Sequence, residues 1–201
     1  QILAEDGAGS DAHPNDLFGS SVSISGNTIA IGAERYGTTV CPTVYDAGRV
    51  YIYTFDEITG AVTFQQVIDA QYYNPGLMSV VSDAETHAFF GKTVDMADDL
   101  LVVGAYKEDQ DEFGALPLDS AGAVYIYRAD ISGAYNFEKK IVPQDREARD
   151  WFGFSVAIYN NQGNSAHAFN KYEIPTFRNC YSGCTGSTHV LTNGTTATTD
   201  D

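Results

Sequence analysis

The chain contains three copies of one sequence pattern in a fixed order, and such tandem repetition restricts the fold more than any other feature. The first block begins with Phe-Gly and occurs at 18–22, 90–94 and 152–156. The second ends with Gly-Ala and occurs at 29–33 and 101–105, and the third begins with Ala-Gly and occurs at 47–53 and 121–127. Gly32 follows Phe18 by 14 residues, and Gly104 follows Phe90 by the same interval. We infer that the blocks belong to copies of one structural unit.

Each block alternates its side chains with the period of a β-strand. In the third block, Val50 lies on one face and Tyr51 on the other. Turn-rich triplets at 25–27 and 97–99 predict tight hairpins. A content of 13 Tyr, 11 Phe and 19 Gly favours strands and turns over helices. Each unit is therefore predicted to be a four-stranded antiparallel blade of a β-propeller. The expected fourth strands are 64–68 and 137–142.

The three blocks in this order resemble the FG-GAP repeat, which forms the blade of the integrin α-subunit type of propeller and of many extracellular repeat proteins. The resemblance covers roughly residues 1 to 160, although no Gly-Ala strand follows the third Phe-Gly block. Glu34 and Tyr106 stand where the family has the Pro of Gly-Ala-Pro. The repeated Phe and Gly residues are assigned structural roles, and we expect Gly32 and Gly104 to lie close to the packed Phe rings of their own repeats. These residues are Phe18, Gly19, Gly32, Phe90, Gly91, Gly104, Phe152 and Gly153.

The resemblance also implies a calcium loop between the Phe-Gly strand and the Gly-Ala strand, where several oxygen ligands surround the ion. Here that loop is shortened to 25–27 and 97–99, and the third copy, at 160–164, carries no carboxylate. We therefore expect no calcium at these turns.

The strand count predicts an incomplete propeller. Residues 1–6 resemble the outer strand of a preceding blade, and two full blades are expected near 14–70 and 82–143. A partial blade is expected near 144–177, within a repeat region that ends near residue 160, and a divergent last blade and Thr-rich tail at 161–201. The expected fold is all-β, with about three blade-equivalents of FG-GAP β-propeller type. Because propellers close with roughly four to eight blades, we expect closure or extension by self-association, or else a fragment of a larger propeller.

The tail is rich in Thr, Gly and Asn, which is typical of a flexible terminus or of an extended arm that lies on a neighbour. Cys180 and Cys184 are close enough in sequence for a disulfide, while Cys41 is free or pairs with one of them. A zinc site would need another ligand beside these two and His189. Asn193 begins a glycosylation sequon, and the Thr residues around it are acceptors for O-linked sugar.

Eleven Lys and Arg against 27 Asp and Glu give a net charge of −16. This charge argues against a nucleic acid or an anionic membrane surface as partner, and no apolar stretch is long enough to insert into a bilayer. The first residues do not resemble a signal peptide, so if the protein is secreted we expect this chain to be the mature form. The loop at 107–119 concentrates carboxylates, which makes calcium the candidate ligand, although a solvated acidic loop is the simpler interpretation. Its candidate ligands are Asp109, Asp111, Glu112 and Asp119.

No catalytic motif accompanies the four histidines, His13, His87, His167 and His189. We therefore expect a secreted, non-enzymatic module with an adhesive or structural role, which self-associates by strand exchange into a ring or filament. The alternative is a fragment of a larger integrin-like or enzyme-attached propeller that binds a protein or glycan. A hydrolase that uses surface carboxylates is the third hypothesis.

Overall fold

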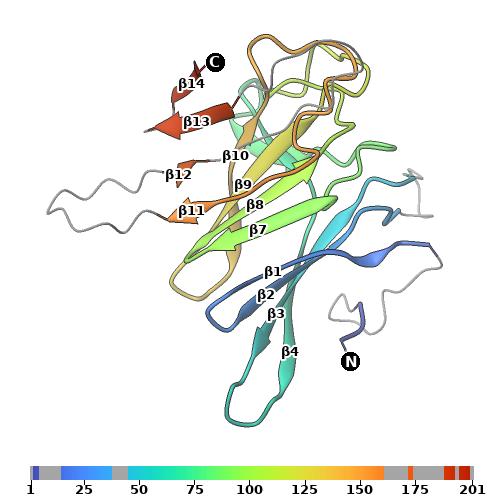
Figure 1. Ribbon diagram of the computed structural model, residues 1–201. Coiled ribbons are helices and arrows are strands. Elements are labelled where there is room, and N and C mark those ends of the chain that lie inside the picture. The colour runs from blue at the N-terminus through green and yellow to red at the C-terminus, as the bar shows by residue number, and fades with distance from the viewer. Residues whose placement is uncertain are drawn as a thin grey trace, which may run out of the picture.

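The computed structural model describes residues 2–4, 15–37, 45–160, 172–173, 188–192 and 195–199, with side chains as far as Ile158. The strands form three antiparallel sheets of four strands and one of two strands (Figure 1). The described residues contain no helix, and hence none that could cross a membrane. The expected all-β fold with four-stranded blades is confirmed.

The first two sheets correspond to the first two repeats. Blade 1 has the order β1-β2-β3-β4, with strands Phe18–Ser25, Thr28–Ala33, Arg49–Phe55 and Val62–Ile68. Blade 2 has the order β7-β8-β9-β10, with strands Thr93–Ala97, Leu100–Ala105, Ala123–Ala129 and Tyr135–Ile141. The third sheet has the order β11-β12-β13-β14, with strands Tyr159–Asn160, Tyr172–Glu173, Thr188–Thr192 and Thr195–Thr199.

The strand registers explain why the apolar pattern repeats. In blade 1, Val22 pairs with Ile31, Ile31 pairs with Tyr51, and Tyr51 pairs with Val67, so these four side chains share one face. The opposite face carries Ala30, Val50, Ile52 and Ile68, which join a buried cluster with the side chains of blade 2. The core is therefore a sandwich between consecutive blades.

A two-stranded hairpin lies between the two blades in sequence and has no counterpart in the repeat pattern. Its strands are β5, Gln71–Asn74, and β6, Ser79–Ser82. Sequence comparison between repeats missed it because the first repeat has no equivalent segment. An Asn-Pro-Gly turn at 74–76 between two Tyr-rich and Val-rich runs was the available signal.

The ends of the repeat region differ from expectation. Residues 2–4 form no strand among the residues that the structure describes. In the third repeat, the Phe-Gly block at 152–156 was expected to be a strand, but the first strand of the third sheet begins only at Tyr159. The third sheet extends to Thr199 and has its own fourth strand, β14, whereas a partial blade was expected near 144–177.

Candidate functional site

The junction between consecutive blades is built from backbone groups at identical repeat positions. Phe90 donates its N–H to Ala47 O at 2.8 Å, and Phe152 donates to Ala121 O at 3.0 Å. Parallel bridges join Gly48 to Phe90 and Gly122 to Phe152. Each Phe-Gly turn therefore binds the preceding blade at the start of its third strand, and we call this contact the Phe-Gly latch.

Glycines at the Phe-Gly latch allow two backbones to touch. A Cβ on Gly32 would lie 2.1 Å from Gly91 O, and a Cβ on Gly104 would lie 2.0 Å from Gly153 O. A larger side chain at Gly32 or Gly104 would therefore be crowded, as expected, and the backbone atoms it would meet first belong to the Phe-Gly turn of the next repeat. Gly91 has a φ of +83°, a left-handed conformation that suits glycine.

Polar side chains on the first strand of each blade contact the next blade. Ser23 Oγ donates to Asp95 Oδ1 at 2.9 Å, and Asp95 Oδ2 accepts the N–H of Ile158 at 2.8 Å. Ser21 Oγ donates to Gly91 O at 2.8 Å. The first strands of blade 1, blade 2 and the third repeat are thus connected in series.

On one face of blade 1, the first strand lacks the cover that the first strand of blade 2 has. In blade 2, Val94 and Met96 are 7% and 6% exposed because blade 1 packs over them. The equivalent residues of blade 1, Val22 and Ile24, are 54% and 62% exposed. We call the exposed surface around Val22 and Ile24 the free face of blade 1; Ile31 and Tyr51, on the same side of the sheet, are buried.

Residues 2–4 lie against the same side of blade 1. They take the position that residues 68–70, at the end of β4, take against blade 2. Tyr53 donates its hydroxyl to Leu3 O at 2.6 Å, as its equivalent Tyr127 donates to Asp69 O at 2.9 Å. Ala4 is 5% exposed and belongs to the buried cluster of Ile29, Ile31, Tyr51 and Tyr53 on the same side of blade 1. The N-terminal segment thus occupies the place of the end of an outer strand, as the sequence comparison indicated.

A comparison with protein-family models matches the FG-GAP repeat at residues 1–53, 80–127 and 135–162. These segments make up more than half of the chain, and each contains one Phe-Gly turn. The chain belongs to the FG-GAP repeat family. A comparison with curated proteins found no match.

In both complete FG-GAP blades, the first two strands are joined by two residues. Gly26 and Asn27 link β1 to β2, and Asp98 and Asp99 link β7 to β8. Gly26 has a φ of +56° and Asp98 a φ of +53°, so the two turns have similar backbone geometry. Asp99 Oδ2 accepts a bond from Arg128 Nη1 at 2.8 Å, which engages that carboxylate with β9.

The carboxylates of the 107–119 loop do not come together as an ion-binding group. Asp109 Oδ1 accepts the N–H of Ser120, while Asp111 Oδ1 accepts those of Phe113 and Ala115. In the described ranges, no group of three His, Cys, Asp or Glu side chains is arranged to hold a metal ion. The pKa of the exposed Asp119 is lowered by hydrogen bonds from Ser120 and Arg149. Asp109 and Asp111 thus stabilise the turns of the loop by accepting backbone hydrogen bonds, and Glu112 is exposed.

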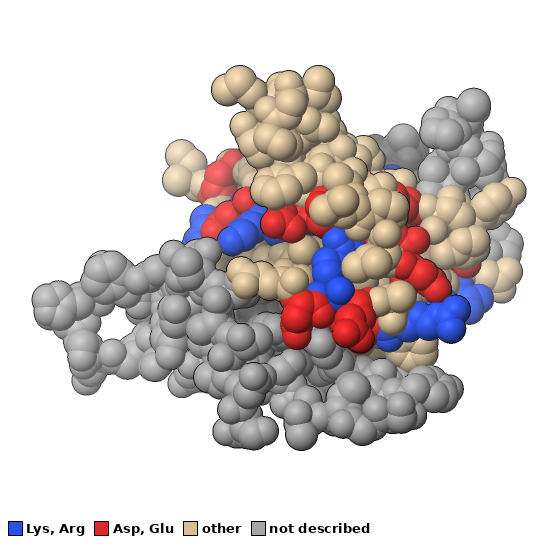
Figure 2. All heavy atoms as spheres, turned by 90° about the horizontal axis from the view of Figure 1, so that it is seen from above, with Lys and Arg blue, Asp and Glu red and all other residues tan. Residues whose placement is uncertain are grey.

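Viewed from above, the molecule shows Asp and Glu side chains beside Lys and Arg side chains (Figure 2). This face therefore carries mixed charge in spite of the net charge of −16.

An aromatic cluster lies where the second and third repeats meet. Trp151 stacks on Phe154 with ring centroids 6.3 Å apart, and Tyr106 meets both rings edge-on. Phe154 is 39% exposed, and Lys92 Nζ lies 5.8 Å from its ring centroid. Flat, partly exposed rings beside a cation are a surface that can bind a ligand.

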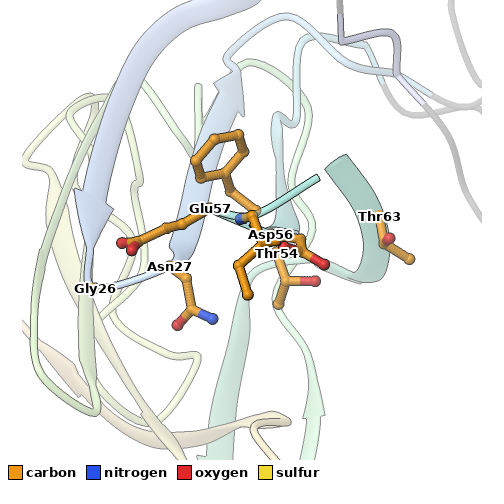
Figure 3. A pocket seen from close by; sticks show the side chains of 8 residues that line it. Gly26, Asn27, Thr54, Asp56, Glu57 and Thr63 are labelled. Atoms are coloured by element: carbon orange, nitrogen blue, oxygen red, sulfur yellow. Dashed lines mark hydrogen bonds between the residues drawn. The ribbon is translucent and has the colours of Figure 1, made fainter. Parts of the chain in front are cut away.

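A hollow of about 570 Å³ lies at the hairpin ends of blade 1 (Figure 3). Its lining includes Asn27, Thr54 and Glu57. Asp56 accepts the N–H groups of Ile58 and Thr59, and these bonds lower the pKa of this exposed carboxyl. The polar groups that the structure shows here stabilise a turn, and we assign no chemistry to the hollow.

Several predicted positions lie outside the described residues, or have only their backbone described. These are Cys41, Cys180, Cys184, His13, His167, His189 and Asn193. His87 Nε2 lies 3.9 Å from Asp46 Oδ2.

Sequence reasoning missed a buried charged cluster in blade 2, which we call the Lys140 cluster. Lys140 Nζ lies 2.7 Å from Asp83 Oδ2 and 3.0 Å from Glu108 Oε1. All three side chains are at most 1% exposed. The available signal was a lysine in β10 directly opposite the buried Tyr125.

Proposed function

We propose that this chain is a secreted, non-enzymatic FG-GAP module with a structural or adhesive role, which associates with a second copy through the free face of blade 1. The observation that carries the proposal is the exposure of Val22 and Ile24 at positions whose equivalents are buried in blade 2. Exposed apolar faces of this kind are typical of interaction surfaces. Secretion and adhesion are inferred from the family resemblance alone.

The occupant of this face is inferred to be another FG-GAP blade. In the described molecule, the equivalent face of blade 2 is covered by Val50, Ile52 and neighbouring apolar residues of blade 1. A second copy that offers a blade at the same angle would repeat this contact, and such a head-to-tail contact gives a ring or a filament.

This arrangement modifies the strand-exchange hypothesis. Residues 2–4 already lie in an outer-strand position, held by Tyr53. The third sheet has four strands, so the N-terminal segment of a neighbour enters its outer position only if β14 leaves. Packing of one sheet face on another requires no such displacement, and we propose it as the main contact.

Sedimentation of the full chain over a range of concentrations tests the proposal. We expect concentration-dependent association, and we expect a Val22→Lys/Ile24→Lys double variant to remain monomeric. Ile58→Lys, at a 97% exposed position on the β3–β4 turn, is the matched control and should associate like the parent chain. A parent chain that is monomeric at every concentration contradicts the proposal and favours a further blade of a larger propeller as the occupant.

The aromatic cluster supports ligand binding as a second candidate function. Trp151 is the single tryptophan of the chain, so its fluorescence reports directly on this surface. Lys107 Nζ lies 5.6 Å from the ring centroid of Tyr106 and favours an anionic glycan or an acidic peptide, whereas Lys92 is paired with Glu34 at 3.1 Å. A titration with acidic oligosaccharides should change the Trp151 emission, and a Phe154→Ala variant should weaken the response.

A further inference from the structure

The Lys140 cluster places an amine against a carboxyl group in a site without solvent exposure. Its ionic groups come from three separate segments: β10, the residue after β6, and the loop after β8. Tyr125 donates its hydroxyl to Asp83 Oδ2 at 2.6 Å. The Lys140 Nζ atom also lies 5.6 Å from the ring centroid of Tyr125 and 6.0 Å from that of Tyr72.

The cluster has an excess of acceptor atoms. Asp83 Oδ1 and Glu108 Oε2 are buried and have no hydrogen-bond partner. Unpaired buried carboxylate oxygens are costly, so one of these groups is expected to carry a proton. Burial raises the pKa of Glu108 to about 8, with smaller raising effects of Asp83 and Glu85 and against the lowering effect of Lys140. At neutral pH, Glu108 is therefore mainly a neutral acid that can donate a proton.

Blade 1 shows that the fold does not require charges at this place. Val67 pairs with Tyr51 in blade 1 as Lys140 pairs with Tyr125 in blade 2. Tyr36 follows Gly32 by the same four residues that separate Glu108 from Gly104. Both Val67 and Tyr36 pack against the apolar cluster of blade 1. An aliphatic and an aromatic side chain thus take the positions of the buried Lys and Glu, which indicates that the charged set has a chemical role.

We propose that Lys140 and Asp83 form an intramolecular isopeptide bond, an amide between Lys140 Nζ and Asp83 Cγ, with Glu108 as the acid–base group. The short Nζ to Oδ2 contact brings the two reacting groups together, and the buried site excludes the water that would compete with the amine. Glu108 touches the amine at 3.0 Å, within the distance for proton transfer.

The reaction needs no oxidant or co-reactant. The ammonium of Lys140 first passes one proton to the carboxylate of Asp83, which leaves a neutral amine beside a neutral acid. The amine lone pair attacks Asp83 Cγ; Glu108 takes a proton from the nitrogen and gives its own to the departing hydroxyl group. One C–N bond forms, one C–O bond breaks, one water molecule leaves, and Glu108 ends in its starting state.

The bond would close a covalent loop that contains β7, β8 and β9 and ends in β10. All four strands of blade 2 would then be held between Asp83 and Lys140, and unfolding of the blade would leave a closed loop with reduced chain entropy. Such a cross-link suits a structural module, although the proposal does not depend on self-association.

Mass spectrometry of the full chain tests this proposal. We expect the intact protein to be lighter than its sequence mass by one water molecule. A tryptic digest should contain a branched peptide that joins the segments around Asp83 and Lys140, and cleavage after Lys140 should be absent because its amine is acylated. Locating the branch is essential, since cyclisation at Asp6-Gly7 also releases one water.

Variants test the roles of Lys140 as the amine, Asp83 as the carboxyl group and Glu108 as the acid–base group. Lys140→Met and Asp83→Ala should restore the full mass and abolish the branched peptide. Glu108→Gln keeps both reacting groups and should also abolish the branch. Lys139→Met, at the exposed neighbouring position, is the matched control and should keep the branch.

Two results overturn the proposal. The first is a parent chain at full mass with normal tryptic cleavage after Lys140, which needs no variant to fold. The second is a water loss that persists in Lys140→Met. A branch that survives in Glu108→Gln overturns the role of Glu108.

Discussion

Blades 1 and 2 have the same strand order and the same aromatic pattern, but the first strand of blade 1 is exposed on a face where the first strand of blade 2 is covered. Phe18 meets Tyr51 edge-on with ring centroids 5.2 Å apart, and Phe90 meets Tyr125 with the same distance and angle. Val94 is nevertheless buried while its equivalent Val22 is half exposed. The interior of each blade is therefore set by its own sequence, whereas burial of its faces depends on the neighbours.

The comparison also separates two kinds of contact between blades. Backbone hydrogen bonds at the Phe-Gly latch recur with nearly the same length at both junctions. Charged side chains at the junctions differ from repeat to repeat. We therefore expect the stability of the array to rest on the glycine contacts and the apolar faces, and only weakly on surface ion pairs.

Substitutions at the junction glycines should have the largest effect. Gly32→Ala and Gly104→Ala each place a Cβ about 2 Å from a carbonyl oxygen of the next repeat. We expect each to lower the free energy of unfolding by about 3 kcal/mol or more, measured by denaturant titration. Gly76→Ala is the control, because its Cβ would meet only the Asn74 side chain, at 3.3 Å. Equal losses at all three positions contradict the latch geometry.

Alanine substitutions at equivalent positions on the two blades should differ in their cost in unfolding free energy. Met96→Ala removes a buried side chain and should cost about 3 kcal/mol of unfolding free energy. Ile24→Ala, at the equivalent exposed position, should change it by less than about 0.5 kcal/mol. Thermal unfolding at a concentration where the chain is monomeric measures both. Similar costs would mean that the free face is covered within a single chain.

The free energy of unfolding should depend on pH through Glu108 of blade 2, which has no charged equivalent in blade 1. The unfolded carboxyl ionises near its ordinary pKa of 4.5, whereas the folded group ionises near 8 because it is buried. The stability that Glu108 contributes is therefore complete below pH 4.5 and is lost as the pH rises through 8, by up to about 1 kcal/mol for each pH unit. Unfolding measured between pH 5 and 8 should show this decline, and Glu108→Gln should reduce it. The charges of Asp83, Glu85 and Lys140 act on Glu108 in a chain whose Lys140 and Asp83 are not joined, so the parent chain is compared at its full sequence mass.

Loss of a surface ion pair at a junction should have the smallest effect. Arg149 Nε lies 3.0 Å from Asp119 Oδ2, and both side chains are more than half exposed. Arg149→Ala should change the free energy of unfolding by less than about 0.5 kcal/mol. The backbone N–H of Arg149 still donates to Asp119 O in this variant. A loss as large as that of Gly104→Ala would show that the side chains, and not the backbone latch, hold the junction.

The sequence predicted the blades well because local alternation and repetition both determine them. The fourth strands were expected at 64–68 and 137–142 and lie at Val62–Ile68 and Tyr135–Ile141. Residues just after Phe90 and Phe152 were expected in strands, but Gly91 and Gly153 are in the left-handed region. There the backbone turns onto the preceding blade, a long-range contact that no local pattern shows.

The Lys140 cluster could not be predicted in the same way. Its members are separated by long stretches of chain, and each looks like an ordinary surface charge in its local context. Lys140 is the equivalent of Val67 in the first repeat, so comparison of the repeats gives no sign that a charged residue is buried at this position. Only the fold brings the amine and the two carboxyl groups into contact.

The direction of the Phe-Gly latch has a consequence for synthesis on the ribosome. Phe90 binds Ala47, and Phe152 binds Ala121, so every latch joins a new segment to one that is already made. Each emerging Phe-Gly turn can dock as soon as it leaves the exit tunnel, without waiting for a later part of the chain. The contacts between blades therefore accumulate in the order of translation, which shortens the time for which a finished blade face is exposed to other nascent chains.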